Sequence, residues 1–269
     1  NQTWKGSAIT PTFSGLKDYA YNADTGGSKL STTGIALTQN THYTLSYTNN
    51  TNIGTATITI TGKGNYIGTK TVNFRIVAVN MSLITVDAIA DRVWNPVSNP
   101  IPTITARYTG ANKTLTTADY TITSSAKTDG TAVPGKVTLT ITGKGNYTGT
   151  KTVTYNLNRR DIGLALKNNS LNIANQTYTG ERLEPTLTGL KDYAYETLTS
   201  TTALSSAGVP LTLNTHYVLN YADNIDVGTA TVTITGNGVY YTGTTTTAFT
   251  IVARSIANGT LGLNITDID

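Results

Sequence analysis

The sequence predicts an all-β protein built from three tandem repeats of a small β-sandwich, and three observations carry this prediction. The chain of 269 residues is rich in Thr, with 38% hydrophobic and only 13% charged residues. The β-branched Thr side chain fits pleated strands, whereas good helix formers are scarce. One glycine-rich motif occurs three times. Short segments of alternating hydrophobic and polar residues flank each copy, which is typical of antiparallel strands with one buried face.

The glycine-rich motif marks a hairpin turn in each of three homologous repeats. TGKGNYIGTKTV begins at Thr61, TGKGNYTGTKTV at Thr142 and TGNGVYYTGTTTT at Thr235. A strand of the type GTATITI precedes each motif, and a second strand such as VNFRIVA follows it. Because a fixed period defines the architecture of a chain, this self-similarity takes priority over any single local signal.

Each repeat then adds further short strands around its hairpin. With no helix signal, about seven short strands in a domain of roughly 90 residues predict an immunoglobulin-like sandwich without the Cys pair of antibody domains. The segments 82–89 and 162–173 are expected to be linker strands, which favours an elongated rod with limited bending. The expected inward-facing residues of the first repeat are Tyr43, Leu45 and Tyr47, then Ala56, Ile58 and Ile60, then Val72, Phe74 and Ile76.

The first and third repeats are more alike than either is to the second. Both contain GLKDYAY, at 15–21 and 189–195, and NTHY, at 40–43 and 214–217. The second repeat is shorter at the place where GLKDYAY would stand. The predicted domains are residues 1–78 without a first strand, a shortened 79–158, and 159–253, followed by 254–269 as the first strand of a further repeat.

The two ends of the sequence predict a longer array. Joining the last residues to the first gives LNITDIDNQTWKG, which is similar to the internal junction SLNIANQTYTG at 170–180. We therefore expect 269 residues to be one period, with neighbouring copies as partners in a covalent tandem or a head-to-tail polymer. In the polymer, 254–269 would add as a strand to residues 1–78 of the next molecule. The candidate assembly residues are Ile256, Leu261, Leu263 and Ile265.

The order of these motifs resembles the immunoglobulin-like repeats, of the Big or MBG type, of large bacterial cell-surface proteins and adhesins. It runs from YTG or WKG and P-T, through NTHY, to GTATITITGKGNYIGTKTVNFRI, and it covers essentially the whole chain three times. The third repeat departs at GNGVYYTG and the second in its shortened first half. The resemblance implies an extracellular stalk or fibre segment attached to a bacterial surface, with spacer or assembly repeats and no catalytic residues.

Composition argues against several other classes of function. The net charge of +4 is spread along the chain without a basic stripe, so we expect no nucleic-acid partner. No apolar run reaches the ~18 residues of a membrane span, so we expect no membrane insertion by this segment. The absence of Cys removes disulfides and thiol catalysis. No constellation of catalytic residues recurs, so we expect no enzyme activity and no cofactor.

A carbohydrate- or protein-binding adhesive module is the alternative function. In GLKDYAY, Tyr19 and Tyr21 share a face if the segment is extended, as do Tyr193 and Tyr195. Exposed Tyr pairs are good binding anchors, whereas packing within the strand core or between domains is the competing explanation. A cell-surface glycan or protein is the expected partner of such a surface.

Three further patterns have ordinary structural explanations. His42, His216 and Asp119 occupy one repeat position, where a polar turn former precedes a strand. Asp223, Asn224 and Asp226 offer oxygen ligands for Ca²⁺, but the first repeat has uncharged Asn residues there. Intramolecular Lys–Asn isopeptide bonds remain open, and a mass deficit of one ammonia per bond would reveal them.

Overall fold

The computed structural model confirms the all-β prediction, with three repeated sheet units that share one strand arrangement. It describes residues 1–22, 28–29, 31–167, 169–193 and 207–258. Within these residues no helix is both long and apolar enough to cross a membrane.

Contacts divide the chain into two compact units, each holding one outer repeat and part of the middle one. The first unit is Asn1–Ala88, Thr103–Thr123 and Leu139–Val153, and the second is Ile89–Pro102, Ser124–Thr138 and Thr154–Asp269. The repeat boundaries expected from the sequence therefore stay a prediction.

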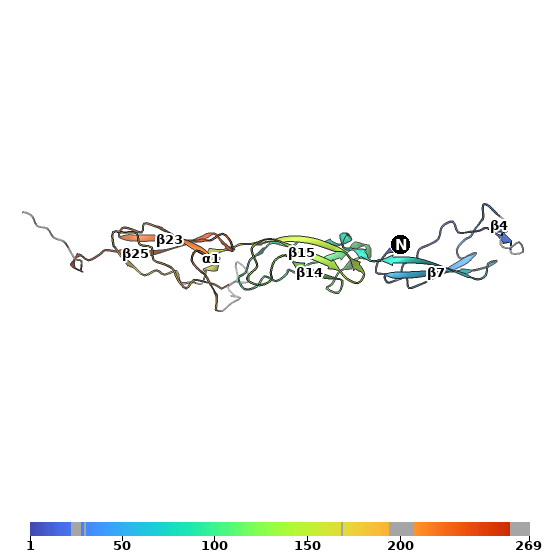
Figure 1. Ribbon diagram of the computed structural model, residues 1–269, viewed down its shortest axis with the longest axis horizontal. Coiled ribbons are helices and arrows are strands. Elements are labelled where there is room, and N and C mark those ends of the chain that lie inside the picture. Colours follow the sequence, from blue (N-terminus) through green and yellow to red (C-terminus); the bar gives the residue numbers. More distant parts are fainter. Residues whose placement is uncertain (23–27, 30, 168, 194–206, 259–269) are drawn as a thin grey trace, which may run out of the picture. The chain divides into compact units, whose positions relative to one another are not determined.

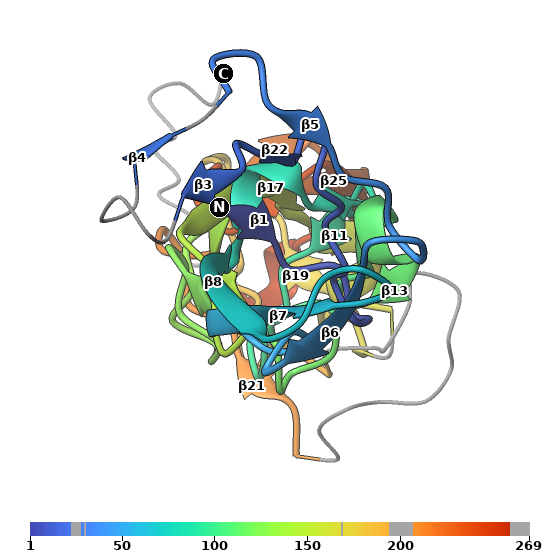
Figure 2. The ribbon, with the colours of Figure 1, turned by 90° about the vertical axis from the view of Figure 1, so that its right-hand side faces the viewer.

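The first repeat contains a four-stranded sheet in the order β1-β8-β7-β6. β6 (Tyr43–Thr48), β7 (Gly54–Gly62) and β8 (Thr69–Val77) are antiparallel neighbours, and β1 (Gln2–Thr3) pairs parallel to the end of β8. Figure 2 shows these strands side by side. Two small pairs complete the repeat: β2 (Lys17–Asp18) with β5 (Ile35–Ala36), and β3 (Tyr21–Asn22) with β4 (Ser28–Lys29).

The second repeat has the equivalent sheet in the order β11-β17-β15-β14. Its other strands form the three-stranded sheet β10-β12-β13 and the parallel pair of β9 with β16. The elements are β9 (Val79–Asn80), η2 (Met81–Leu83), β10 (Thr85–Val86), β11 (Arg92–Val93), β12 (Ala106–Tyr108), η3 (Thr109–Ala111), β13 (Lys113–Thr114), β14 (Tyr120–Ser124), β15 (Gly135–Gly143), β16 (Tyr147–Thr148) and β17 (Thr150–Asn158).

The third repeat has its sheet in the order β19-β25-β23-β22, with the small pairs β18-β24 and β20-β21. The short helix α1, which is labelled in Figure 1, contacts β23 and β25. The elements are β18 (Arg160–Asp161), α1 (Ile162–Ala165), β19 (Gln176–Thr177), β20 (Lys191–Asp192), β21 (Val209–Pro210), β22 (Tyr217–Ala222), β23 (Gly228–Gly236), β24 (Tyr241–Thr242), β25 (Thr244–Val252) and η4 (Ile256–Asn258).

The glycine that opens each hairpin turn is required by close backbone approach. A Cβ on Gly62 would come within 2.7 Å of the Ile67 amide nitrogen, and Gly143 and Gly236 face the same crowding. Any larger residue would push the turn apart. This explains why the motif keeps TG at the end of the first hairpin strand in all three repeats.

The alternation expected from the sequence places the core on one face of each hairpin. In β15 and β23 the inward residues are fully buried, including Ile141 and Ile234 at 0% exposure. Their counterpart in the first repeat, Ile60, is only half-buried, although Ala56 and Ile58 are buried. The first repeat is therefore less covered at this end of its sheet.

The segments expected to be linker strands begin with short helical turns, although 82–89 also contains the strand β10 (Thr85–Val86), which pairs with β12. A 3-10 turn, η2, follows β9, and the four-residue helix α1 follows β18. The cause lies in the residue before each turn: the Asn80 side chain accepts a hydrogen bond from Ser82 N, and Asp161 accepts one from Leu164 N. Such N-caps satisfy backbone donors and start a helical turn.

Candidate functional site at the repeat junctions

The junctions between repeats hold the most elaborate side-chain arrangements in the described residues. A single residue, Ala78, separates β8 from β9, and a single residue, Arg159, separates β17 from β18. The last strand of one repeat thus runs almost directly into the first strand of the next. So short a connection leaves little freedom at the joint.

Each junction is packed around a buried Trp. Trp4 N donates to Val77 O at 3.0 Å, and the Trp4 ring meets the Tyr147 ring edge-on with centroids 5.7 Å apart. Trp94 repeats this, with its ring centroid 5.5 Å from that of Tyr241. Both Trp side chains are at most 6% exposed. Each Trp lies beside the end of the last strand of its own repeat and packs on the hairpin Tyr of the next repeat. Such an aromatic contact buries a large apolar area.

The first strand of each following repeat closes the junction from the other side. β9 pairs parallel to β16, with Val79 opposite Tyr147, and β18 pairs parallel to β24, with Arg160 opposite Tyr241. The first residue of the ensuing helical turn is fully buried in both cases, at 0% exposure for Met81 and for Ile162. The junction is thus a strand pair sealed by an apolar plug.

At each junction, the side chain that caps the helical turn packs against a glycine. A Cβ on Gly149 would come within 3.2 Å of the Asn80 amide, and one on Gly243 within 2.2 Å of Asp161 Oδ2. Both glycines have positive φ, of +77° each. Only Gly satisfies the conformation and the space together.

The second junction adds a buried ion pair. Arg160 Nε lies 2.7 Å from Asp192 Oδ2, and the two side chains are 4% and 0% exposed. The Tyr241 hydroxyl donates to the same Oδ2 at 3.2 Å. Burial and the Asp192 charge strongly raise the pKa of Tyr241, so the phenol stays protonated and continues to donate.

The first junction lacks this carboxylate. Val79 stands where Arg160 does, and the Tyr147 hydroxyl is buried without a hydrogen-bond partner among the described residues. Burial and the Asp119 charge raise the pKa of Tyr147 to about 12. The ammonium of Lys113 lies 5.6 Å from the Trp4 ring centroid and 5.5 Å from that of Tyr147, a cation–π contact that covers both rings.

Sequence reasoning did not find the ion pair, although a signal was present. Asp18 and Asp192 are the Asp of GLKDYAY, a segment that the second repeat lacks. The residue two places after the last strand is Val79 before the second repeat but Arg160 before the third. Arg160 precedes a repeat that contains GLKDYAY, whereas Val79 precedes the repeat that lacks it. This correlation indicates that the Arg pairs with the Asp of the motif.

The tyrosines proposed as a binding surface are described only in part. Tyr19 and Tyr193 are half-buried, and each lies against a glycine: a Cβ on Gly34 would meet the Tyr19 ring at 2.9 Å, and one on Gly208 the Tyr193 ring at 3.1 Å. The backbone of Tyr21 belongs to β3, but its side chain and all of Tyr195 lie outside the described residues. Their role in binding stays a prediction.

The assembly segment also falls partly outside the described residues. Leu261, Leu263 and Ile265 lie beyond them. Ile256 begins the 3-10 turn η4 rather than a strand, and its side chain is 76% exposed. Of the four candidate assembly residues, Ile256 is the one that lies within the described residues.

The shared position of His42, Asp119 and His216 serves a turn. Thr38 N donates to His42 Nδ1 at 2.9 Å, Thr212 N to His216 Nδ1 at 2.8 Å, and Thr116 N to Asp119 Oδ2 at 2.9 Å. Three side chains thus accept the same backbone hydrogen bond. This bears out the turn-former interpretation and requires Nδ1 of each His to be unprotonated.

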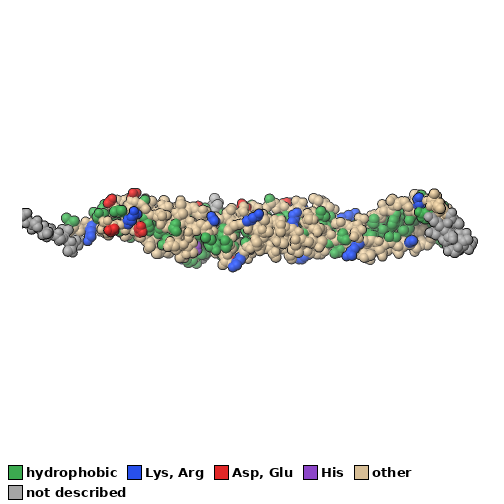
Figure 3. All heavy atoms as spheres, turned by 45° about the horizontal axis from the view of Figure 1, so that its top comes forward, with side chains coloured by type: hydrophobic (Ala, Val, Ile, Leu, Met, Phe, Trp, Pro, Cys, Tyr) green, Lys and Arg blue, Asp and Glu red, His purple; other side chains and the backbone are tan. Residues whose placement is uncertain are grey.

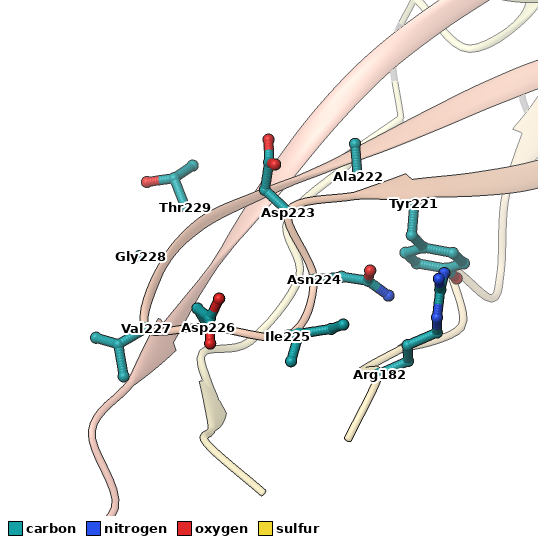
Figure 4. Close-up of a pocket in the computed structure, with 10 residues that line it drawn as sticks. All are labelled: Arg182, Tyr221, Ala222, Asp223, Asn224, Ile225, Asp226, Val227, Gly228 and Thr229. Atoms are coloured by element: carbon teal, nitrogen blue, oxygen red, sulfur yellow. The ribbon is translucent and has the colours of Figure 1, made fainter. Parts of the chain in front are cut away.

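The acidic loop of the third repeat lines a pocket with a volume of about 510 Å³. Figure 4 shows the carboxylates of Asp223 and Asp226 on different sides of the loop. The amide of Asn224 instead donates to Leu183 O at 3.0 Å, as Asn50 donates to Ile9 O in the first repeat. Among the described residues no three His, Asp or Glu side chains gather as metal ligands would.

On the face drawn in Figure 3, most of the spheres belong to the backbone or to side chains that are neither hydrophobic nor charged. On the face drawn in Figure 3, Lys and Arg side chains lie as separate spots rather than in one stripe. The outward Thr residues of the hairpins account for this character, because they alternate with the buried residues along each strand.

Comparisons with known proteins assign no family. No protein-family model matches the chain, and no curated protein matches it in sequence. A solved structure of the protocadherin gammaB7 EC3-6 cis-dimer is 11% identical, with a TM-score of 0.23. That match covers 74% of this chain and 57% of the other. From its own sheets and junctions, the chain is an all-β protein with three tandem repeats, each built around a four-stranded sheet of the same strand arrangement.

Proposed function

We propose that the chain is a non-catalytic structural segment of a bacterial surface stalk or extracellular fibre. One observation carries the proposal: at both junctions a one-residue connection, a buried Trp and a buried plug lock one repeat to the next. Such joints suit a module that transmits force or maintains a distance. The motif resemblance to surface repeats supports the extracellular location.

The location is tested by labelling intact source cells with an antibody raised against this chain. The proposal predicts label on the outer surface without permeabilisation, at a distance from the envelope. A denaturing gel of the same cells then gives the mass of the native protein against the 28.4 kDa of this chain. Label that requires permeabilisation would overturn the proposal.

The adhesive alternative rests on the GLKDYAY loops and makes a separate prediction. If Tyr19 and Tyr193 contact a glycan or a protein, Tyr→Ala changes there should abolish cell adhesion and leave surface label unchanged. Under the stalk proposal, adhesion survives these changes. The two functions are therefore separated by one pair of variants.

A further inference from the structure

Five residues that begin at the end of the last strand of the third repeat align with the two internal junctions. Val252-Ala253-Arg254-Ser255-Ile256 aligns with Asn158-Arg159-Arg160-Asp161-Ile162, and with Val77-Ala78-Val79-Asn80-Met81. A helical turn begins at the same place in all three, as η4, α1 and η2. Ser255 is also a residue type that caps helices, as Asp161 and Asn80 do.

The third copy differs from the other two in its surroundings. Met81 and Ile162 are fully buried, whereas Ile256 is 76% exposed. Arg254 and Ser255 are exposed too. Tyr178, the counterpart of Trp4 and Trp94, is half-buried where those two are buried. These counterparts of the internal junction residues are thus all more exposed at this end than Trp94 and Ile162 are at the second junction.

The first repeat displays the complementary half of a junction. Tyr66 and Ile67 correspond to Tyr241 and Thr242, but within the described residues no strand pairs with them, and Ile67 is 96% exposed. Gly68, which corresponds to Gly243, has φ of +82° and nothing within 4 Å of its Cβ position. Ile60 is half-buried, whereas its counterparts, Ile141 and Ile234, are fully buried.

The charge of Arg254 indicates which kind of repeat can bind residues 254–256. Arg254 is the counterpart of Arg160, whose partner is the Asp of GLKDYAY. The first repeat has this carboxylate as Asp18; burial and the Asp18 charge raise the pKa of Tyr66, as burial and the Asp192 charge raise that of Tyr241. No ion pair of Asp18 is found in the described residues. The second repeat lacks the carboxylate, and its junction has Val79.

We propose that residues 252–256 of one copy of this chain dock on the first repeat of a second copy and rebuild the second junction there. Arg254 pairs with Asp18 and Tyr66 of that copy, Ser255 lies over its Gly68, and Ile256 plugs the space beside its Ile60. The inference deepens the proposed stalk function, because it names the contact that joins one period to the next.

The test uses a peptide with the sequence of residues 250–258, titrated into the isotope-labelled full chain. Arg254→Ala and Ile256→Ser in that receiver keep its own tail from competing, and both positions are exposed. The expected result is a saturable shift of the Gly68 amide signal, while the signals of Gly149 and Gly243 do not move. These two glycines are matched controls, since their own caps already occupy them.

Two changes then test the ion pair. A peptide with Arg254→Ala should bind at least about tenfold more weakly. Asp18→Asn in the receiver should weaken the unchanged peptide to the same degree, but should not weaken the altered peptide further. Unmoved amide signals from β7 and β8, in the same repeat as Asp18, show that Asp18→Asn still folds.

Either of two results overturns the proposal: no shift at Gly68 with millimolar peptide, or equal binding by the unchanged and Arg254→Ala peptides. A failed titration leaves the surface label unaffected, and so does not count against the stalk function. Conversely, docking with label only inside the cell would disprove the stalk function and retain the contact.

Discussion

Asp192 shows how much a single buried residue carries at a junction. Its carboxylate forms an ion pair with Arg160 and accepts a hydrogen bond from the Tyr241 hydroxyl, and it is fully buried. Two charges in such a place are stable only together, because each offsets the desolvation of the other. The pair therefore fixes which side chain can occupy the first-strand position of the third repeat.

We predict that Asp192→Asn lowers the free energy of unfolding by about 3–5 kcal/mol, since Arg160 is left buried without a countercharge. Urea unfolding followed by Trp fluorescence measures this. The matched control is Asp87→Asn, in the exposed pair with Arg107, where a loss of about 1 kcal/mol or less is expected. The double variant Arg160→Val, Asp192→Asn, which imitates the first junction, should recover part of the loss. Equal losses for both single variants would contradict the argument.

His216 gives a prediction about pH. Burial lowers the pKa of His216, and its Nδ1 must be unprotonated to accept from Thr212 N. Because the unfolded state binds the proton more readily, stability is complete above the ordinary His pKa of about 6.5. It falls as the pH drops from there through the lowered native pKa.

The measurement is the free energy of unfolding between pH 5 and 7.5, compared between wild type and His216→Asp. The variant places Asp where the second repeat has Asp119, which accepts the equivalent hydrogen bond. It should lose the part of the pH dependence that His216 causes, since the Asp stays ionised over this range. An unchanged pH profile would show that His216 does not titrate with folding.

At the scale of elements, the glycines after the hairpin turns test how much the capping residue of the preceding strand contributes to stability. Gly243→Ala adds a Cβ that displaces the Asp161 cap, in addition to the strain of positive φ. Gly68→Ala meets the same φ strain with open space around it.

We predict a loss of about 1–2 kcal/mol for Gly68→Ala and a further loss of about 1 kcal/mol for Gly243→Ala, from the weakened cap. Thermal or urea unfolding of the two variants gives the difference. Equal losses would mean that the cap over Gly243 contributes nothing to stability.

The strands themselves were predictable from sequence, whereas the short helices were not. Alternation in Ala56, Ile58 and Ile60 identifies β7 because a half-buried strand needs a period of two. The helical turns after β9 and β18 are too short for any helical period to show, and a cap before three or four residues is their only local signal. The Arg160–Asp192 pair joins residues 32 positions apart, so it depends on tertiary packing.

At the scale of the whole molecule, burial increases from the first repeat to the others. The inward residues of β15 and β23 are fully buried, but Ile60 in β7 is not. A strand with an uncovered end opens more easily than the same strand beneath a plug.

Hydrogen exchange should therefore be at least about tenfold faster at the Gly62 end of β7 than at the matching ends of β15 and β23. Mass spectrometry of exchanged peptides from the three hairpins measures this within one sample. Because the three hairpins are nearly identical in sequence, intrinsic exchange rates largely cancel. Slower or equal exchange in β7 would contradict the argument from burial.

Because Ala78 and Arg159 are single-residue connections, the effect of an insertion there depends on whether it adds an odd or an even number of residues. Side chains of an extended chain face opposite sides in turn, so one inserted residue would turn Val79 outward and Asn80 inward, whereas two would restore the original faces. The joints therefore tolerate changes in residue number only in even steps, and the array grows safely only by copying a repeat together with its joint. Odd insertions would be selected against at 78 and 159 while surface loops accept any length.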